Sequence, residues 1–152
     1  MTLSPSAPAD PEVLRQSIRA AGLKVTAPRV AVLQALQSRP HSSADHVFES
    51  VRNTLPGTST QAVYGVLAAF TEAGLVRRFD PAGSPALFEC RVRDNHHHLV
   101  CISCGAIRDV DCVIGAAPCL TPSDTHGFTV IAAEVTFNGL CEQCRETVAP
   151  AG

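Results

Sequence analysis

The chain has 152 residues, of which 45% are hydrophobic and 17% charged, and its formal net charge is −2. The length fits one ordinary domain or two small ones, and the composition argues against a wholly disordered chain. No apolar run of about 18 residues is present, so we expect no membrane span. Residues 1–11 contain no cationic segment followed by an apolar one, so they do not predict a signal peptide. We therefore expect a cytoplasmic protein, in which seven cysteines favour metal ligands or redox groups over structural disulfides.

The first 88 residues predict a helical domain that ends in a β-hairpin. After a flexible arm at 1–10, the expected helices occupy residues 11–21, 26–39, 43–55 and 59–73, and the hairpin occupies 75–79 and 86–89. Thr26, Ser42 or Ser43, and Thr58 or Ser59 are the capping residues that start the last three helices. Short helices followed by a hairpin are the order of a winged helix-turn-helix, whose last helix enters the DNA major groove. A small helical bundle with a hairpin is the alternative.

The second half has a different character and predicts a small α/β unit. Strands are expected at 99–101, 106–110 and 128–137, whereas 112–126 is weakly helical at most. We place the boundary near residues 85–92. The fold class is therefore α+β, with a winged helix-turn-helix at 11–88 followed by a metal-binding dimerisation domain at 89–152.

Two Cys-x-x-Cys pairs in the second half predict a metal site. Cys101 and Cys104 form the first pair, and Cys141 and Cys144 form the second. Zinc prefers four tetrahedral ligands, and two such pairs supply four thiolates. A four-thiolate site has no open coordination position, so we expect a structural zinc ion. Four unrelated buried thiols are the alternative.

Three consecutive histidines precede the first cysteine pair. On a strand His96 and His98 point to one side and His97 to the other. Two histidines with a nearby carboxylate are a usual site for a divalent transition metal. The further candidate ligands are Glu89, Asp109 and, if the two halves fold towards each other, His41. A surface histidine cluster without a ligand is the alternative.

The basic residues are concentrated in the first half, because only Arg108 and Arg145 of the twelve Lys and Arg residues follow residue 93. The expected recognition helix carries Thr60, Gln61 and Tyr64 on its polar face, where they would reach base edges, the thymine methyl group or phosphate. The candidate phosphate contacts are Lys24, Arg29, Arg77 and Arg78. A solvated polar face is the alternative. The remaining thiols, which are candidates for a redox role, are Cys90, Cys112 and Cys119.

Several of these segments together resemble the ferric uptake regulator (Fur) family. The resemblance covers about residues 12–145, and its most specific segments are 22–29, 61–67, 73–76, 94–105 and 141–144. The stretches 109–112 and 117–120 are similar to the FurA branch, whose members typically repress catalase-peroxidase genes.

The resemblance implies a metal-dependent repressor that binds a palindromic operator in double-stranded DNA as a homodimer. It implies structural Zn²⁺ at the four cysteines and Fe²⁺ at a regulatory site, with Mn²⁺ or Zn²⁺ as other occupants. The regulatory ligands that it implies are His41, Glu89, His96, His98 and Asp109. Cys90 stands beside Glu89, near the position where peroxide-sensing relatives carry an aspartate, so a thiol could enter that site.

Other functions fit parts of this pattern. A repressor that responds to zinc or another metal, or one that works purely as a thiol switch, would keep the DNA-binding half. A metalloenzyme would use His96, His98 and Glu89 with an open coordination position. We expect no enzyme and no small-molecule substrate, because the sequence offers no additional general base or evident substrate pocket. A zinc-delivery or zinc-buffering protein is a further alternative, and indifference to operator DNA at every metal loading would favour it.

Overall fold

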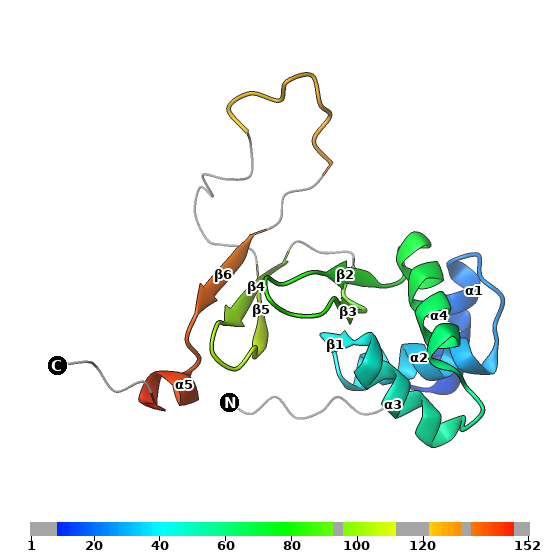
Figure 1. Ribbon diagram of the computed structural model, residues 1–152. Helices are drawn as coiled ribbons and strands as arrows, with labels where there is room; N and C mark the ends of the chain where they lie inside the picture. Colours follow the sequence, from blue (N-terminus) through cyan, green and yellow to red (C-terminus); the bar gives the residue numbers. More distant parts are fainter. Residues whose placement is uncertain (1–8, 93–95, 112–121, 132–134, 148–152) are drawn as a thin grey trace. The chain divides into compact units, whose positions relative to one another are not determined.

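The computed structural model describes residues 9–92, 96–111, 122–131 and 135–147, and the chain divides into two compact units, residues 1–93 and 94–152 (Figure 1). The division falls a few residues after the predicted boundary between Phe88 and Glu89. Glu89 belongs to the first unit because it pairs with Arg77 in a strand ladder of that unit. No helix among the described ranges is long and apolar enough to cross a membrane.

The first unit begins with four helices, which are α1 (Pro11–Ala20), α2 (Ala27–Ser38), α3 (Ala44–Thr54) and α4 (Thr60–Glu72). Each helix starts where a side-chain oxygen satisfies a backbone N–H of the first turn. Thr26, Ser43 and Ser59 cap α2, α3 and α4, as the sequence predicts, and Asp10 caps α1. All four predicted helices are confirmed, with ends that differ by one or two residues.

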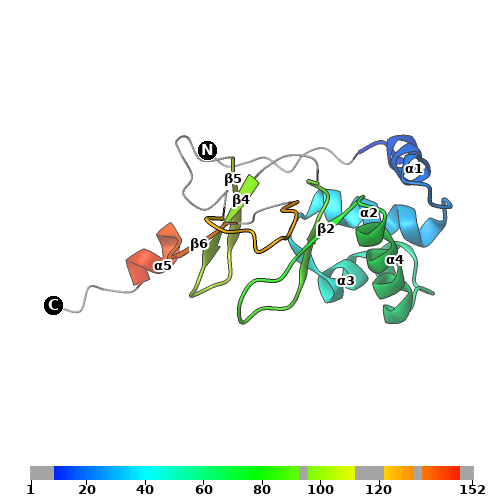
Figure 2. The same ribbon diagram turned by 90° about the horizontal axis from the view of Figure 1, so that it is seen from above.

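The core of the first unit lies between these helices. Helix α2 packs against α1, α3 and α4, so it is the central helix of the group (Figure 2). Leu14, Ile18, Leu36 and Phe70 have no exposed surface. Burying one such side chain stabilises the fold by roughly 1.5–3 kcal/mol. The first unit therefore has a hydrophobic core of its own.

A small antiparallel sheet closes the first unit. Its strands β1 (Ser42–Ser43), β2 (Arg77–Phe79) and β3 (Leu87–Glu89) lie in the order β1-β3-β2. The predicted hairpin is confirmed as β2 and β3. The sequence did not predict β1, because a strand of two residues carries no periodicity and is defined only by its pairing with β3.

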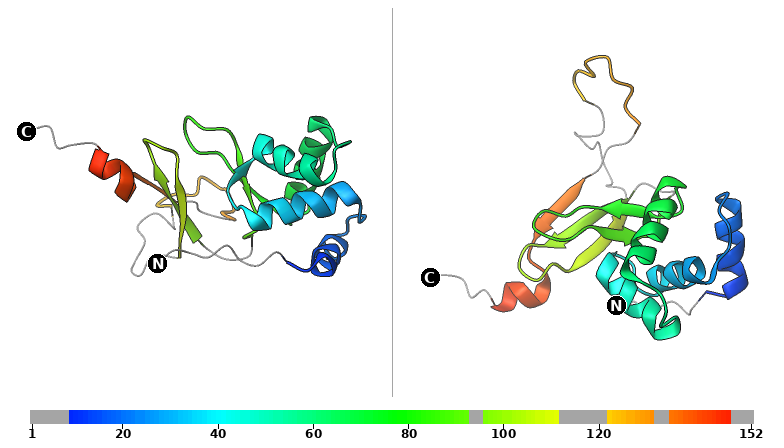
Figure 3. Two further views of the ribbon diagram at one scale, coloured as in Figure 1. Left: turned by 90° about the horizontal axis from the view of Figure 1, so that it is seen from below. Right: turned by 45° about the vertical axis from the view of Figure 1, so that its right-hand side comes forward.

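The second unit is built on another three-stranded sheet (Figure 3). Its elements are β4 (His96–Cys101), β5 (Ile107–Asp111), β6 (Thr136–Gly139) and the short helix α5 (Glu142–Thr147). The central strand β4 runs antiparallel to β5 and parallel to β6. Among the described residues of this unit, Cys101 is the one buried apolar side chain. The described part of this unit therefore has no hydrophobic core comparable to that of the first unit.

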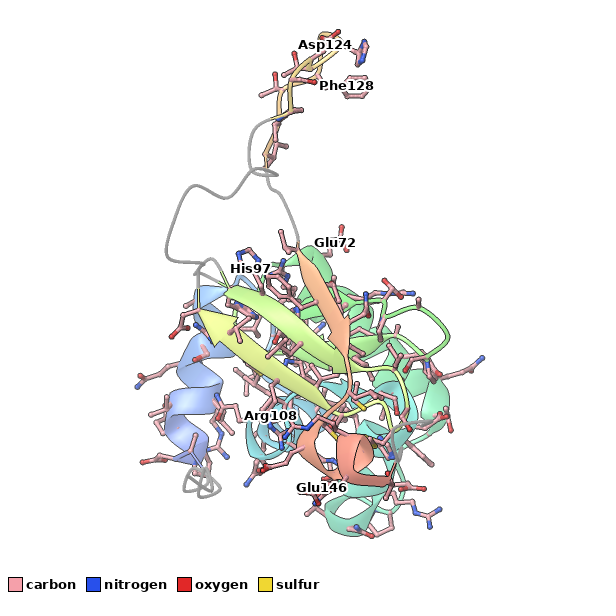
Figure 4. All side chains as sticks on the ribbon, turned by 90° about the vertical axis from the view of Figure 1, so that its left-hand side faces the viewer. Glu72, His97, Arg108, Asp124, Phe128 and Glu146 are labelled. Atoms are coloured by element: carbon pink, nitrogen blue, oxygen red, sulfur yellow. The ribbon has the colours of Figure 1, made fainter. Side chains whose placement is uncertain are left out.

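The predicted strand at 128–137 is wrong for its first part. Residues 128–131 form no strand, and Phe128 and Ile131 are 77% and 95% exposed; Phe128 projects from its loop beside Asp124 (Figure 4). A strand needs a hydrogen-bonded neighbour, which alternating apolar residues alone do not supply. Residues 122–126 contain no helix, and the rest of the 112–126 segment lies outside the described residues.

Candidate metal centres and nucleic-acid interface

Three elements of the second unit bring the four cysteines together. Cys101 ends β4, Cys104 lies in the turn towards β5, and Cys141 and Cys144 stand at the start of α5. One sulfur from each lies within 4.8 Å of the others, and the Sγ atoms of Cys104 and Cys141 are 3.7 Å apart. Tetrahedral zinc at about 2.3 Å from each sulfur separates its ligands by about 3.8 Å. The donor set therefore fits zinc in number, chemistry and spacing.

The electrostatics of the cluster also favour a cation. The backbone N–H groups of Cys104 and Cys141 lower the pKa of the Cys101 thiol to about 6. The Ser103 hydroxyl lowers the pKa of Cys144, but the Cys141 and Cys104 side chains outweigh it and raise that pKa to about 12. The neighbouring sulfur atoms thus favour the protonated form of Cys144. A divalent soft metal ion would take the place of that proton.

In the first unit, strand pairing brings His41 to Glu89. Strands β1 and β3 are antiparallel with Ser42 opposite Phe88, so the next pair along the ladder is His41 and Glu89. His41 Nε2 lies 2.8 Å from Glu89 Oε2, and both side chains are largely buried. The backbone of His41 has a φ of 56°, in the left-handed region that a residue other than glycine seldom adopts. The fold therefore holds this imidazole and this carboxylate in one place at some backbone cost.

In the second unit, three further predicted ligands meet on β4 and β5. Asp109 stands opposite His98 in the ladder, and its Oδ1 lies 3.6 Å from His98 Nε2 and 3.9 Å from His96 Nε2. The His96 and His98 rings are 4.9 Å apart and edge-on. Both imidazoles thus lie near the same carboxylate oxygen, and His98 is the nearer of the two. This set is the kind of nitrogen and oxygen site that suits iron, manganese or zinc.

His97 lies on the opposite side of β4, as the alternation of a strand requires. Its ring meets Phe137 of β6 edge-on at 6.3 Å between centroids, and His97 is 3% exposed. The prediction that His97 faces away from the other two histidines is confirmed.

The polar residues predicted for DNA contact lie on the outer face of α4. Thr60, Gln61 and Tyr64 are exposed, whereas Val63 and Leu67 on the inner face are buried in the core. Tyr64 lines a cleft of about 510 Å³ together with Arg78 of β2. The contact of these residues with DNA remains a prediction.

The side chains predicted to contact DNA phosphates differ in their exposure and in the hydrogen-bond partners that they already have. Lys24 is exposed in the link between α1 and α2, and its carbonyl accepts a hydrogen bond from Arg29 Nη1 at 2.7 Å. Arg77 is half-buried on β2. The Arg78 guanidinium is held by the Asp80 carboxylate, whose hydrogen bonds raise the pKa of Arg78.

Of the three remaining thiols, the structure describes Cys90. It packs against the core of the first unit, and this burial, together with the charge of Glu89, raises the pKa of its thiol to about 12. A thiol with so high a pKa is a slow nucleophile at neutral pH. Cys112 and Cys119 lie outside the described residues.

The sequence missed two features that support these sites. The pairing of β1 with β3 fixes His41 against Glu89, and Ser103 supports the cysteine cluster. The only sequence signal for Ser103 is its place inside Cys101-x-x-Cys104.

The ferric uptake regulator family model matches residues 20–138, a span that contains both histidine–carboxylate pairs and the first cysteine pair. This chain belongs to the ferric uptake regulator family. The regulator is 56% identical to the transcriptional regulator FurA of Mycobacterium tuberculosis over 129 residues. This aligned region covers 85% of this chain and 88% of that protein. This similarity supports the FurA branch that the sequence indicated.

Solved structures agree with this assignment. The ferric uptake regulator of Pseudomonas aeruginosa with manganese has a TM-score of 0.63 at 29% identity, over 86% of this chain and 98% of that one. The regulator of Francisella tularensis with iron has a TM-score of 0.64 at 25% identity, over 82% of this chain and 96% of that one. The α+β fold is thus confirmed. The chain is a metal-responsive transcriptional regulator rather than an enzyme, which removes the metalloenzyme alternative.

Proposed function

We propose that this regulator is an iron- and redox-responsive repressor that binds a palindromic operator in double-stranded DNA as a homodimer in the cytoplasm. The observation that carries the proposal is the presence of two chemically different donor sets, one of four thiolates and one of imidazoles and carboxylates. One set suits a permanent structural ion and the other an exchangeable one. The proposed targets are iron or oxidative-stress genes such as that of catalase-peroxidase, as the similarity to FurA suggests.

The four cysteines would hold the structural Zn²⁺. Four sulfur ligands fill the coordination sphere of zinc, so no position is left for a substrate. The free energy of zinc binding would become folding free energy. The second unit needs such a contribution because its described part buries little apolar surface. With its fold maintained, this unit would supply the dimer interface.

The regulatory site would draw on both units, with His41 and Glu89 from the first and His96, His98 and Asp109 from the second. Support comes from the family and from the contacts that each group already makes within its own unit. A bound divalent ion, Fe²⁺ in the first place and Mn²⁺ or Zn²⁺ as rivals, supplies the positive charge that draws these donors together. The family structures with manganese and with iron are consistent with this range of metals.

The regulatory site would act as a switch between two states, a closed form in which the two ligand groups are joined and an open form in which they are apart. When the two ligand groups are joined, the units are fixed relative to each other, so the two winged helices of a dimer are set for successive major grooves. Only tighter binding of the ion to the closed form can shift this equilibrium. In each winged helix, Thr60, Gln61 and Tyr64 would read the bases. The phosphate contacts would come from Lys24, Arg29 and Arg77.

The test is an operator-binding titration of the zinc-loaded chain with Fe²⁺, Mn²⁺, Ni²⁺ and additional Zn²⁺ under anaerobic conditions, repeated after peroxide. We expect tight binding with Fe²⁺ and release after peroxide. Replacing one ligand, as in His98→Ala, should weaken the metal response by at least about 10–100-fold, which is the usual cost of removing even an outer-shell partner.

The matched control is His97→Ala, which removes an equally buried imidazole from the other side of the same strand. It should leave the metal response in place. Operator binding that ignores every metal would contradict the proposal. If a chain with both His96→Ala and His98→Ala still released DNA on peroxide treatment, a pure thiol switch would be the better explanation.

A further inference from the structure

The two consecutive arginines of β2 lie on opposite faces of the small sheet in the first unit. In the ladder with β3, Arg78 stands opposite Phe88, whereas Arg77 is one position earlier on β2. Side chains alternate between the faces of a sheet, and directly opposed residues share a face. Phe88 belongs to the core between the helices, and it lines the same cleft as Arg78 and Tyr64 of α4. Arg78 is therefore the β2 arginine on the same face of the sheet as α4.

A carboxylate two positions further along the chain holds the Arg78 guanidinium. Asp80 Oδ1 accepts hydrogen bonds from Arg78 Nε at 3.1 Å and from Arg78 Nη2 at 2.9 Å, and Asp80 Oδ2 accepts one from Nε at 3.1 Å. Arginine binds phosphate groups with the same forked geometry. The two side chains are 55% and 62% exposed, so this pair lies at the surface. Asp80 thus occupies an edge of the guanidinium that a DNA phosphate could otherwise bind.

The pair changes the charge that this face presents to DNA. A cation strengthens DNA binding when it neutralises a phosphate and releases condensed counterions, whatever the base sequence. The charge of Arg78 is already balanced by Asp80 at hydrogen-bond distance. A phosphate that approaches Arg78 also approaches the carboxylate, which repels it. Arg78 therefore contributes less to DNA binding than its position beside α4 would allow.

We propose that Asp80 limits the sequence-independent part of the DNA affinity by keeping Arg78 from binding the DNA backbone. The inference rests on the DNA binding proposed above. A regulator that responds to a metal must release DNA when the metal is absent, and any remaining attraction to phosphate opposes this release. By balancing one cation on the α4 face, Asp80 lowers that remaining attraction. The polar side chains of α4 then supply a larger share of the binding free energy.

The experiment compares the full chain, loaded with Zn²⁺ and Mn²⁺, with its Asp80→Asn variant. Asparagine keeps the shape of the side chain and removes its charge. Fluorescence anisotropy measures the dissociation constant for a mixed-sequence DNA duplex at a series of salt concentrations. No operator is needed, because phosphate contacts do not depend on base sequence. Thermal unfolding without DNA verifies the fold of each variant, which the exposure of both side chains leads us to expect unchanged.

We expect Asp80→Asn to bind the duplex more tightly at low salt and with a steeper salt dependence. One additional neutralised phosphate changes the slope of log K against log salt by about 0.9 per protomer. A fourfold rise in salt should therefore weaken the variant at least about threefold more than the unaltered chain.

Three results would count against the inference or its basis. Weaker binding by Asp80→Asn would show that the carboxylate positions Arg78 for DNA, and an unchanged slope would show that the released Arg78 meets no phosphate. Either result overturns the inference and leaves the proposed function standing. If the unaltered chain binds no DNA at any metal loading, the proposed function itself fails.

The Arg78→Ala background supplies the matched control. Asp80→Asn removes the same negative charge in that background, but no guanidinium remains to be released. The salt slope should then stay constant, and any gain in affinity should be smaller. Equal gains in both backgrounds would show that the Asp80 charge acts on DNA directly, which contradicts the inference. Asp80→Glu keeps a carboxylate and should bind like the unaltered chain.

Discussion

At the scale of single residues, Cys90 illustrates how position controls reactivity. Its thiol is adjacent to a proposed metal ligand, yet burial and the Glu89 charge raise its pKa from an ordinary 9.0 to about 12. Because the folded state favours the protonated thiol, the stability that Cys90 contributes is complete below pH 9 and declines as the pH rises from about 9 to 12.

We predict that a maleimide or iodoacetamide at pH 8 labels Cys90 far more slowly in the folded chain than in denaturant. The reason is the low thiolate fraction in the folded state together with burial. Peptide mass spectrometry after timed quenching measures both rates. Equal rates would show that Cys90 is available as a redox sensor, as the sequence allowed.

Arg29 combines a proposed DNA contact with a structural one. Its guanidinium donates to the Lys24 carbonyl at 2.7 Å, which braces the link between α1 and α2. We predict that Arg29→Ala destabilises the first unit by about 0.5–1.5 kcal/mol, the net value of one such hydrogen bond. Urea unfolding in the absence of DNA measures this.

The salt dependence of operator binding then tests the phosphate role of Arg29. Loss of a phosphate contact should lower the salt slope by about one unit. Lys24→Ala keeps the Lys24 carbonyl and serves as the matched control. It should change the salt slope with little effect on stability.

At the scale of elements, α4 contains a glycine that the structure does not require. Gly65 lies on the exposed face between Thr60 and Glu72, and a Cβ added there would meet nothing within 4 Å. We predict that Gly65→Ala stabilises the first unit by about 1 kcal/mol, the difference between glycine and alanine in a helix. Thermal unfolding of the DNA-free chain measures this gain.

Operator affinity of the same variant shows whether DNA approaches the bare backbone at Gly65. If it does, Gly65→Ala should bind the operator more weakly despite its greater stability. Ser50→Ala, at an exposed position of α3, is the control that should leave the affinity unchanged.

The elements also show what the sequence could and could not predict. Thr26, Ser43 and Ser59 mark helix starts through local hydrogen bonds, so these starts are readable from local sequence. In contrast, β1 exists only through its pairing with a strand more than forty positions away, and α5 has no buried face to give it a periodicity. The same dependence on distant strand pairing limits how much of the candidate metal site the sequence could predict. The histidine and cysteine spacing predicts ligand identity, whereas the contact of His41 with Glu89 depends on a strand register that no local pattern specifies.

At the scale of the whole molecule, the two units are stabilised by different means. The buried apolar cluster lies entirely in the first unit, whereas the described part of the second unit buries little apolar surface and brings four cysteines together. We predict that a strong zinc chelator unfolds the second unit while the first retains its helices. A structural zinc site contributes about 10–16 kcal/mol of binding free energy, so its loss exceeds what a small unit can tolerate.

Amide hydrogen exchange resolves the two units in one experiment. Protection should disappear from β4, β5 and β6 and persist in α2 and α4. Restoring zinc should restore it. Uniform loss of protection across both units would show instead that they unfold as one cooperative body.

The left-handed backbone at His41, a proposed ligand of the regulatory ion, limits which substitutions could change the metal preference. A φ of 56° suits Gly and is adopted by Asn, Asp and His more often than by other residues, which are strained there by about 1–3 kcal/mol. Glycine offers no ligand atom. A saturation library at position 41, selected for a new metal, should therefore return aspartate or asparagine. The backbone conformation thus limits which residues can replace histidine here, independently of their coordination chemistry.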